Sequence, residues 1–413
     1  MATRGEHLVK ADRRFATGAG IAGRIAAPGF KRVLDLIDEG LEQGGINATL
    51  PDGSQRRIGF HRPGPVALVN LNSWMSLVRL ATSGSVGWYK AWAAGEWSSP
   101  DPVPLFELFM LNGQSLGEIG RAKGLMRGIN RVAHRLRDNG LGQARHNIAA
   151  HYDLGNDFYA EWLDPSMTYS SARFAPGDDL EAAQRRKVAL LLDRLDLKPG
   201  DRLLEIGCGW GTLAIAAAQR GARVVGLTLS AEQKSWADEK IAKARLSDRI
   251  EIRLQDYRQI SEQFDSIASV EMVEAVGQRW WPAYLESISR NLKRGGRAAV
   301  QFISIRHELF DGYSRNADFI QAYIFPGGML IDEPQFQALA TERGLSWKDR
   351  EGFRVDYAET LRQWRERFDA AVREGRLKEF SHRFHNLWRY YLMYCEGGFR
   401  GGGIDVAQIT LSR

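Results

Sequence analysis

Residues 203–218 read LLEIGCGWGTLAIAAA: an apolar run typical of a buried strand, a glycine-rich turn and the start of a helix. Glycine lets the backbone of such a turn pass close to a ligand where any Cβ atom would clash. The turn follows the pattern GxGxG, whereas the dinucleotide fingerprint is GxGxxG and a P-loop ends in Gly-Lys-Ser/Thr. We predict a nucleotide site lined by Gly207, Gly209 and Gly211, with Glu205 at the end of the strand. A dinucleotide enzyme is the alternative.

Strands and helices alternate around this turn. Apolar runs typical of strands occur at residues 202–206, 223–227, 250–254, 264–270 and 297–304. Helical patterns lie between them, at residues 180–195, after residue 211, at 231–244 and at 284–292. This alternation predicts an α/β fold with an open parallel sheet and helices on both faces. Right-handed crossovers would bring the carboxyl ends of the strands to one edge, where such sheets bind ligands.

The first part of the chain has a different pattern of apolar and polar residues. A helical pattern near residue 30 is followed by short, turn-bounded apolar runs, so we expect a small α+β domain over residues 1–112. Residues 113–145 predict a basic amphipathic linker helix, in which apolar side chains alternate with Arg121, Lys123, Arg127, Arg131 and Arg135. A solvated linker helix that packs on the core is the alternative explanation. Residues 146–413 then form the domain with the glycine turn.

The composition is globular and excludes several classes of protein. The 413 residues suffice for two domains, with 44% hydrophobic and 26% charged residues. The net charge of +6 fits an anionic partner, either nucleic acid or phospholipid headgroups. The only cysteines, Cys208 and Cys395, exclude a disulfide framework and a cysteine-rich zinc site, and we expect no metal. No apolar stretch is long enough for a signal peptide or a membrane span, so any membrane contact should be peripheral.

Polar residues follow the second and third strands. In dinucleotide-binding folds an acidic side chain that binds the ribose usually follows the second strand, but this chain has no acidic residue there. Thr228 and Gln233 offer neutral hydrogen-bonding groups at this position instead. Asp256 and Tyr257 follow the third strand and are suited to hold the edge of an adenine ring and to stack on it. These four residues extend the predicted nucleotide site.

The glycine turn, in the form E-x-G-x-G-x-G, resembles motif I of the class I S-adenosylmethionine-dependent methyltransferases. Five segments narrow the class further: HYDLGNDFYAEWLDPSMTYSSARF (151–174), LTLSAEQ (227–233), VEMVEAVG (270–277), YIFPGG (323–328) and YCEGGFR (394–400). In this order they closely resemble the cyclopropane-fatty-acyl-phospholipid synthase family, which includes mycolic-acid cyclopropane synthases and C-methylating fatty-acid enzymes. The resemblance is strong over residues 145–413. The earlier residues resemble the family only in their number and in their general sequence pattern.

The resemblance implies a Rossmann-like class I methyltransferase fold and one-carbon transfer from S-adenosylmethionine to the cis double bond of a phospholipid acyl chain. Because an alkene is a weak nucleophile, the enzyme must align it with the methyl donor and exclude water. The carbocation that results is stabilised by π faces and carboxylates. A base then removes a proton. Loss from the new methyl closes a cyclopropane, and loss from a neighbouring chain carbon leaves a methyl-branched alkene.

The resemblance also assigns residues to the cofactor. Tyr169 and Ser170 would close over it, and the three glycines of the turn would line its amino-acid and ribose portion. Thr228 and Gln233 would contact the ribose, and Asp256 and Tyr257 the adenine.

Family members hold a bicarbonate base with a cysteine, a glutamate, a histidine, an isoleucine and a tyrosine. Glu274, Ile303 and Tyr357 match three of these, whereas Ser171 stands in place of the cysteine and Gln301 in place of the histidine. Serine and glutamine still hydrogen-bond an anion, but neither supplies an imidazole to receive a proton. We therefore expect less reliance on bicarbonate and a methyl-branched product beside or instead of a cyclopropane. Glu274 becomes the base if burial raises its pKa.

Cys395 matches a cysteine proposed as catalytic in the family. No neighbour along the sequence offers this thiol a base, so a small buried side chain is the alternative explanation.

The partners implied are a membrane phospholipid with an unsaturated acyl chain and an anionic membrane surface, with residues 1–112 contacting lipid. We expect a cytoplasmic protein on the inner face of the membrane, no nucleic acid, and leave a homodimer open. Two other classes also stay open. One is a methyltransferase acting on a small molecule or RNA, although no RNA-binding module is recognisable. The other is a non-catalytic lipid-binding homologue, against which the intact glycine turn and Glu274 argue.

Overall fold

The computed structural model describes residues 4–9, 27–117, 154–316 and 318–413. The chain divides into two compact units. The first comprises Met1–Arg137, Arg306–Pro326 and Val372–Ile404, and the second comprises Asp138–Ile305, Gly327–Ala371 and Asp405–Arg413. The boundaries of these units differ from the three continuous ranges expected from the sequence, 1–112, 113–145 and 146–413. Two late segments belong with the first unit because tertiary packing, rather than chain continuity, defines a compact unit.

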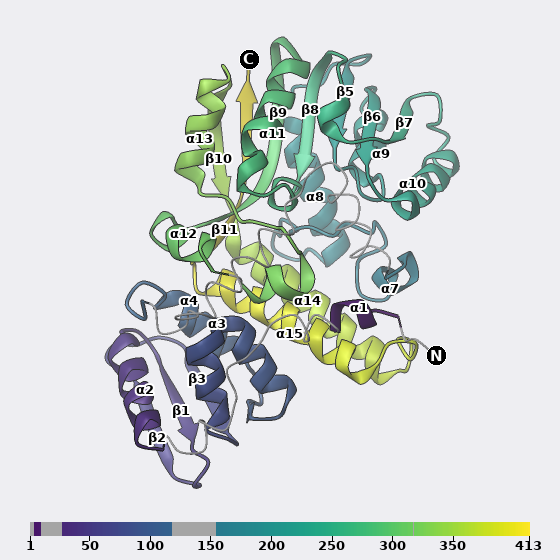
Figure 1. Cartoon of the computed structure of the whole chain (residues 1–413). Helices are drawn as coiled ribbons and strands as arrows, with labels where there is room; N and C mark the ends of the chain where they lie inside the picture. The colour runs from purple at the N-terminus through teal and green to yellow at the C-terminus, as the bar shows by residue number, and fades with distance from the viewer. Residues whose placement is uncertain (1–3, 10–26, 118–153, 317) are drawn as a thin grey trace. The chain divides into compact units, whose positions relative to one another are not determined.

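The second unit is built on a seven-stranded sheet, which in the described residues has the order β10-β11-β9-β8-β5-β6-β7 (Figure 1). Its strands are β5 (Arg202–Ile206), β6 (Arg223–Thr228), β7 (Ile250–Leu254), β8 (Phe264–Val270), β9 (Leu292–Ile305), β10 (Ser346–Gly352) and β11 (Ile404–Ser412). Strands β5 to β9 pair in parallel and confirm the five expected strands. The unexpected pair β10 and β11 is antiparallel, so the sheet is mixed.

Helices cover both faces of this sheet (Figure 1). One layer contains α8 (Leu180–Asp193), α9 (Thr212–Gln219) and α10 (Ala231–Lys243); the other contains α11 (Trp281–Asn291) and α13 (Glu333–Glu342). The unit also contains α7 (Asn156–Ala160) and most of α14 (Arg354–Arg373). Asp179 accepts a hydrogen bond from Ala182 N and so caps α8, and Ser230 caps α10 in the same way. The predicted α/β fold with helices on both faces of the sheet is confirmed.

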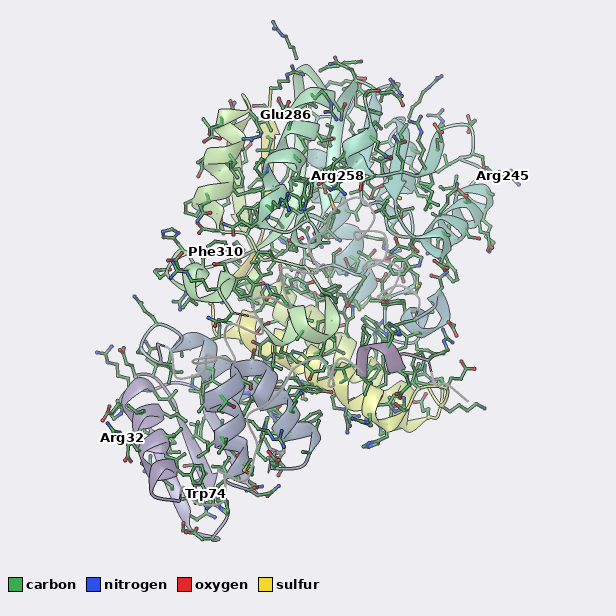
Figure 2. All side chains as sticks on the ribbon, viewed as in Figure 1. Arg32, Trp74, Arg245, Arg258, Glu286 and Phe310 are labelled. Atoms are coloured by element: carbon green, nitrogen blue, oxygen red, sulfur yellow. The ribbon has the colours of Figure 1, made fainter. Side chains whose placement is uncertain are left out.

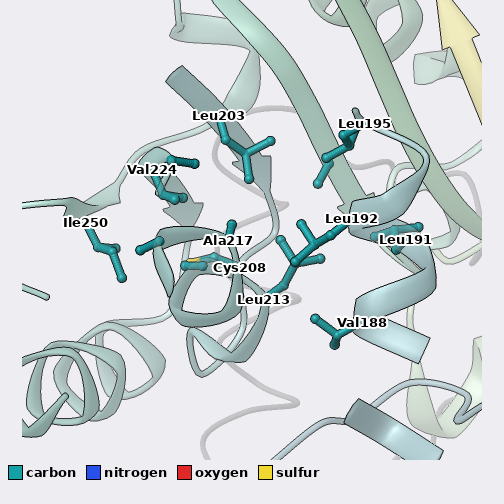
Figure 3. Packing of buried hydrophobic residues seen from close by; sticks show 14 of the residues in the cluster. Val188, Leu191, Leu192, Leu195, Leu203, Cys208, Leu213, Ala217, Val224 and Ile250 are labelled. Carbon is teal, nitrogen blue, oxygen red and sulfur yellow. The ribbon is translucent and has the colours of Figure 1, made fainter. Parts of the chain in front are cut away.

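An aliphatic core fixes β5 against its neighbouring elements. Leu203 of β5, Leu213 of α9 and Leu192 of α8 lie close together in Figure 3, and all three are at most 4% exposed. Burying a leucine side chain contributes about 1.5–3 kcal/mol. This packing holds the strand that leads into the glycine turn. The turn is tied to the next strand as well, because the amides of Gly207 and Cys208 both donate to the carbonyl of Leu227 in β6.

The first unit is an α+β structure, as expected from the sequence. Its sheet has the order β2-β1-β3-β4 in the part of the chain that is described, with β1 (Gly45–Thr49), β2 (Gln55–Gly59), β3 (Val66–Leu71) and β4 (Trp97–Ser98). Its helices are α1 (Glu6–Val9), α2 (Ala27–Gly40), α3 (Met75–Ala93), α4 (Val103–Leu111), α12 (His307–Ser314), the π-helical turn Ile320–Ile324 and α15 (His382–Arg400). The tryptophans stabilise this unit: Trp88 stacks on Trp97 at 4.5 Å, and Trp74, labelled in Figure 2, stacks on Phe30.

Two further expectations concern the linker helix and membrane-spanning helices. The basic linker helix expected over residues 113–145 falls almost entirely outside the described residues and stays a prediction. Within the ranges that are described, no helix combines the length and apolarity that crossing a bilayer requires.

Candidate functional site

A pocket lies in the second unit at the carboxyl edge of the parallel strands. The glycine turn and the residues that follow β6, β7 and β8 line it. Nine of the ten residues predicted to hold the cofactor lie in this lining: Tyr169, Ser170, Glu205, Gly207, Gly209, Thr228, Gln233, Asp256 and Tyr257. The tenth, Gly211, lies at the N-cap of α9 with φ of 84°, so it shapes the turn rather than the pocket wall. The structure therefore brings this predicted set together, as sheet topology requires.

The glycines of the turn are needed for two different reasons. Gly207 has φ of 82°, and a Cβ atom there would lie 2.7 Å from Cγ of Met272. Gly209 has φ of 51°, and a Cβ atom there would meet no described atom within 4 Å. Positive φ favours glycine at both positions. The open space beside Gly209 faces the pocket that it lines, so this backbone provides a cradle for a ligand.

Glu205 lines this pocket and carries a buried carboxyl group. The residue is 3% exposed, and its Oε2 atom has no hydrogen-bond partner among the described residues. Burial raises the pKa of the carboxyl to about 8, and the nearby charge of Lys187 opposes this increase. A buried polar atom without a partner is costly, so this oxygen is suited to a ligand with a hydroxyl or ammonium donor.

Lys187 is a buried cation at the same pocket. It is 1% exposed, projects from α8, and its Nζ atom donates a hydrogen bond of 2.6 Å to Oγ of Ser170. Burial lowers the pKa of the ammonium to about 8, whereas the charges of Glu271, Asp164 and Glu205 raise it. Lys187 therefore lies among carboxylates and is hydrogen-bonded to a residue expected to close over the cofactor.

The predicted ribose and adenine residues are held by local contacts. Thr228 Oγ1 donates to Gln233 Oε1 at 2.9 Å, which fixes the two side chains against each other. Both carboxylate oxygens of Asp256 accept from the guanidinium of Arg258, at 2.9 and 2.7 Å. Arg258 is labelled in Figure 2. Asp256 thus orders the turn after β7, and its contact with adenine stays a prediction.

Three of the residues predicted to hold bicarbonate converge on one carboxylate, that of Glu271. Its Oε1 atom accepts from the backbone amide of Ser171 at 2.9 Å and from Nε2 of Gln301 at 2.7 Å. Its Oε2 atom accepts from the hydroxyl of Tyr357 at 2.7 Å. The Ser171 hydroxyl donates to the carbonyl of Ala172 instead. Glu271 also lines the pocket, whereas Ser171, Gln301 and Tyr357 surround it from outside the lining drawn from the described residues.

Glu271 combines opposing effects on its pKa. Burial raises the pKa, and the hydrogen bonds from Tyr357, Ser171 and Gln301 and the charge of Lys187 lower it. Its φ of 46° is unusual for a residue other than glycine. The chain immediately after β8 therefore adopts a costly conformation in which the carboxylate meets three donors.

Glu274 and Ile303 form a second contact next to Glu271. The amide of Ile303 donates to Oε1 of Glu274, and the Oε2 atom has no hydrogen-bond partner among the described residues. Burial raises the pKa of Glu274 to about 8, and the charge of Glu271 adds to this increase. Of this pair, Glu271 is the carboxylate favoured in the ionised state and Glu274 the one favoured in the protonated state. Glu274 lies outside the pocket lining as described, and its catalytic role stays a prediction.

Cys395 belongs to the first unit and is not part of the described pocket lining. Burial raises the pKa of its thiol, and the charge of Asp318 raises it further. Both effects disfavour the thiolate that a nucleophile needs. A partly buried structural thiol therefore explains Cys395 better, and a catalytic role stays a prediction.

Sequence reasoning missed Glu271 and Lys187. Glu271 follows β8 directly, so its position at the carboxyl edge of a predicted strand was a usable signal. Lys187 lies on the same face of α8 as Ala183 and Leu191, and all three side chains are buried. A lysine on the apolar face of a helix was the second signal.

The comparisons with known proteins identify the family of the chain. The family model described as mycolic acid cyclopropane synthetase matches residues 140–409 of the chain. The chain belongs to this family. It is a S-adenosylmethionine-dependent methyltransferase of the cyclopropane-fatty-acyl synthase type, a family whose members modify lipid acyl chains.

Curated and solved relatives support the assignment. Tuberculostearic acid methyltransferase UfaA1 of Mycobacterium tuberculosis is 41% identical over 81% of this chain and 80% of its own. The cyclopropane-fatty-acyl-phospholipid synthase of Escherichia coli K12 is 41% identical over 64% of this chain and 66% of its own. The mycolic acid cyclopropane synthase CmaA1, solved with SAH and CTAB, is 32% identical and superposes with a TM-score of 0.62 over 65% of this chain and 98% of its own.

The residues of the pocket fit S-adenosylmethionine. The unpartnered oxygen of Glu205 and the cradle beside Gly209 suit its hydroxyl or ammonium donors and a close backbone approach. Thr228, Gln233 and Tyr257 add hydrogen-bonding and aromatic groups along the same lining. In the described ranges, no three His, Cys, Asp or Glu residues gather where a metal ion would bind.

Proposed function

We propose that the protein adds a one-carbon unit to the cis double bond of an unsaturated phospholipid acyl chain, and that Glu271 receives the proton that is lost. S-Adenosylmethionine, when bound, supplies an electrophilic methyl group. The supporting observation is the convergence of Ser171, Gln301 and Tyr357 on the Glu271 carboxylate. Family members are expected to hold bicarbonate with residues at these same positions. Here the donors hold a carboxyl group of the protein itself, which supports Glu271 as the base in place of that ion.

The roles of the two glutamates follow from their surroundings. Burial raises the pKa of Glu271, and three hydrogen-bond donors and the charge of Lys187 oppose this increase and so favour the ionised form, which a base requires. Glu274 has a pKa of about 8 and accepts from a backbone amide through one oxygen only. It therefore holds a proton at neutral pH and stabilises the pair by avoiding two adjacent negative charges.

The step balances without a further reactant. With S-adenosylmethionine bound, the π electrons of the alkene would form the bond to the methyl carbon while the methyl–sulfur bond breaks and its electrons stay on the sulfur, and the adjacent chain carbon would become cationic. A C–H bond on a chain carbon beside the cation, or on the new methyl group, would then break; its electrons would form the new double bond or the ring bond, respectively, and its proton would pass to Glu271. We propose that the main product is a methyl-branched unsaturated chain. The substitutions Ser171 and Gln301 at the base site and the methyltransferase relative that matches 81% of the chain support this choice.

We also propose that the enzyme meets its phospholipid at an anionic membrane surface. The net charge of +6 and the arginines of residues 113–145 support this proposal.

Chemical rescue tests the proposed base. Glu271→Gly removes the carboxylate and suits the positive φ of this position, so the chain should still fold. It also leaves the donors of Ser171, Gln301 and Tyr357 facing the vacated space. We expect turnover to fall at least about 100-fold in bicarbonate-free buffer, and to recover in part when bicarbonate or formate is added. Glu274→Gln, the matched control, should keep turnover and gain nothing from these anions. Full activity of Glu271→Gly without an added anion would overturn the proposal.

A further inference from the structure

A chain of hydrogen bonds leads from α8 to Glu271 across three neighbouring strands. Arg194, at the C-cap of α8, donates through Nε to Oε1 of Gln408 in β11 at 3.3 Å. Gln408 donates through Nε2 to Oε1 of Gln301 in β9 at 3.0 Å. Gln301 donates through Nε2 to Glu271, at the end of β8. Strands β11, β9 and β8 are adjacent in the sheet, so the chain follows the strand order.

Arg194 fixes the donor and the acceptor of every hydrogen bond in this series. A guanidinium can only donate, so Gln408 must present its oxygen to Arg194 and its NH₂ group to Gln301. Gln301 must then accept through its oxygen and present its own NH₂ group to Glu271. The second hydrogens of both amides also have acceptors: the carbonyl of Lys187 for Gln408, at 3.4 Å, and the carbonyl of Ser171 for Gln301, at 3.5 Å. Reversing either amide would place oxygen against oxygen.

The side-chain amides of Gln301 and Gln408 are buried, so a reversed amide would leave polar groups without partners. Gln301 and Gln408 are each 0% exposed, so no solvent replaces a lost partner. Arg194 is anchored by further bonds to Glu351 and to the carbonyl of Asp349, at 2.9 and 2.7 Å. The guanidinium thus keeps its position at the start of the chain.

The geometry points to Gln408 as a positioning residue for the proposed base. Together with Arg194, Gln408 sets the direction of the Gln301 amide, so that Glu271 faces a donor and stays ionised. This inference rests on the function proposed for Glu271. Gln408 itself has no described contact with Glu271, and among the described contacts it meets the pocket lining through its bond to the backbone carbonyl of Lys187.

Other groups also act on the charge of Glu271. Tyr357, from α14, donates to it, Lys187, from α8, attracts its negative charge, and Glu274 repels it once Glu274 itself ionises. Replacing Gln408 removes none of the side-chain interactions of these three residues with Glu271, although the bond from Gln408 to the backbone carbonyl of Lys187 is lost in both variants described below.

Two variants of Gln408 test the inference. In Gln408→Glu a carboxylate, held ionised by Arg194, would attract the NH₂ group of Gln301 and turn its oxygen toward Glu271. In Gln408→Leu the oxygen of Gln301 loses its donor without any added charge. We expect the pKa of the Glu271 carboxyl to rise in both variants, by about one unit or more in Gln408→Glu. Ile409→Val, in the same strand but on its opposite face, is the control and should leave this pKa unchanged.

The pKa is measured by carbon-13 NMR titration of enzyme labelled at glutamate carboxyls, in which Glu271→Gln identifies the resonance. The acid limb of the kcat profile should move to higher pH by the same amount, with turnover recovered at high pH and KM for S-adenosylmethionine unchanged. A purely structural role would lower kcat equally at every pH and leave the carboxyl titration in place, which would overturn the inference. An active Glu271→Gln would instead refute the proposed base, whatever the Gln408 variants show. An inactive Glu271→Gln with unshifted Gln408 variants would refute the positioning role alone.

Discussion

The hydroxyl of Tyr357 lies 2.7 Å from Oε2 of Glu271 and donates a hydrogen bond to it. This bond joins α14 to the residue that follows β8, two elements far apart in the sequence. It occupies the oxygen that Ser171 and Gln301 do not contact, so both oxygens of the carboxylate have donors. The tyrosine expected to hold a bound anion thus donates to a carboxyl group of the chain itself, and its contact with bicarbonate stays a prediction.

Removing this hydroxyl should change the pH dependence of turnover. Tyr357→Phe deletes one donor to Glu271, so the pKa of Glu271, already raised by burial, should rise further. A hydrogen bond to a charged group contributes about 1.5–3 kcal/mol, equivalent to about one to two pKa units. A base works in its ionised form, so the acid limb of the kcat profile should move to higher pH. An unchanged limb would show that Tyr357 does not act through Glu271.

Binding of the cofactor should depend on the open side of Gly209. In Gly209→Val the side chain enters the space beside the turn, so calorimetry should show loss of S-adenosylmethionine binding, by at least about 100-fold. Gly177→Val is the matched control, because Gly177 also has a positive φ and open space but lies outside the described pocket lining. Undiminished binding by Gly209→Val would mean that the cofactor does not approach this turn.

The protonated state of Glu274 should be visible in stability measurements. Its pKa is about 8 in the folded protein and 4.5 as the reference value, so the folded state keeps a proton that the unfolded chain releases. The stabilisation is fully present below pH 4.5 and is lost as the pH rises toward 8, by up to about 1.4 kcal/mol per unit. Glu274→Gln should flatten this decline in the free energy of unfolding between pH 5 and 8. Parallel curves for the two proteins would show that Glu274 is ionised in the fold.

Charge reversal tests the proposed membrane contact. Replacing Arg127, Arg131 and Arg135 by glutamate should weaken co-sedimentation with anionic phosphatidylglycerol vesicles, since each basic residue near such a surface contributes about 1 kcal/mol. The effect should diminish at high salt. Equal co-sedimentation of both proteins at low salt would favour the linker explanation of this segment.

The parallel part of the fold could be predicted because each strand carries its own signal. Strands β5 to β9 are apolar runs separated by helical patterns, and the glycine turn marks the edge of the sheet that binds ligands. Strand β10 lacks such a signal, since most of its side chains are exposed and polar. It is a strand only because it pairs with β11, more than 50 residues later in the chain. Pairing of this kind depends on tertiary structure.

The site divides in the same way. Most residues predicted to hold the cofactor belong to motifs at the ends of consecutive strands, so local sequence patterns could predict residues that share one pocket lining. The surroundings of Glu271 come from β9, from α14 and from the segment before α8, and no local pattern links these three. Lys187 and Gln408 are polar residues whose burial becomes evident only when the neighbouring elements are in place.

The dependence of turnover on bicarbonate tests the protein-borne base most directly. The measurement is the rate of methyl transfer to vesicles of mono-unsaturated phosphatidylglycerol in carbonate-depleted buffer, with and without added bicarbonate, and with the lipids analysed by mass spectrometry. Because Glu271 already occupies the donors of Ser171, Gln301 and Tyr357, we expect equal rates in both buffers and methyl-branched unsaturated chains among the products. Turnover that occurs only with added bicarbonate and yields only cyclopropanes would contradict the assignment of Glu271 as the base.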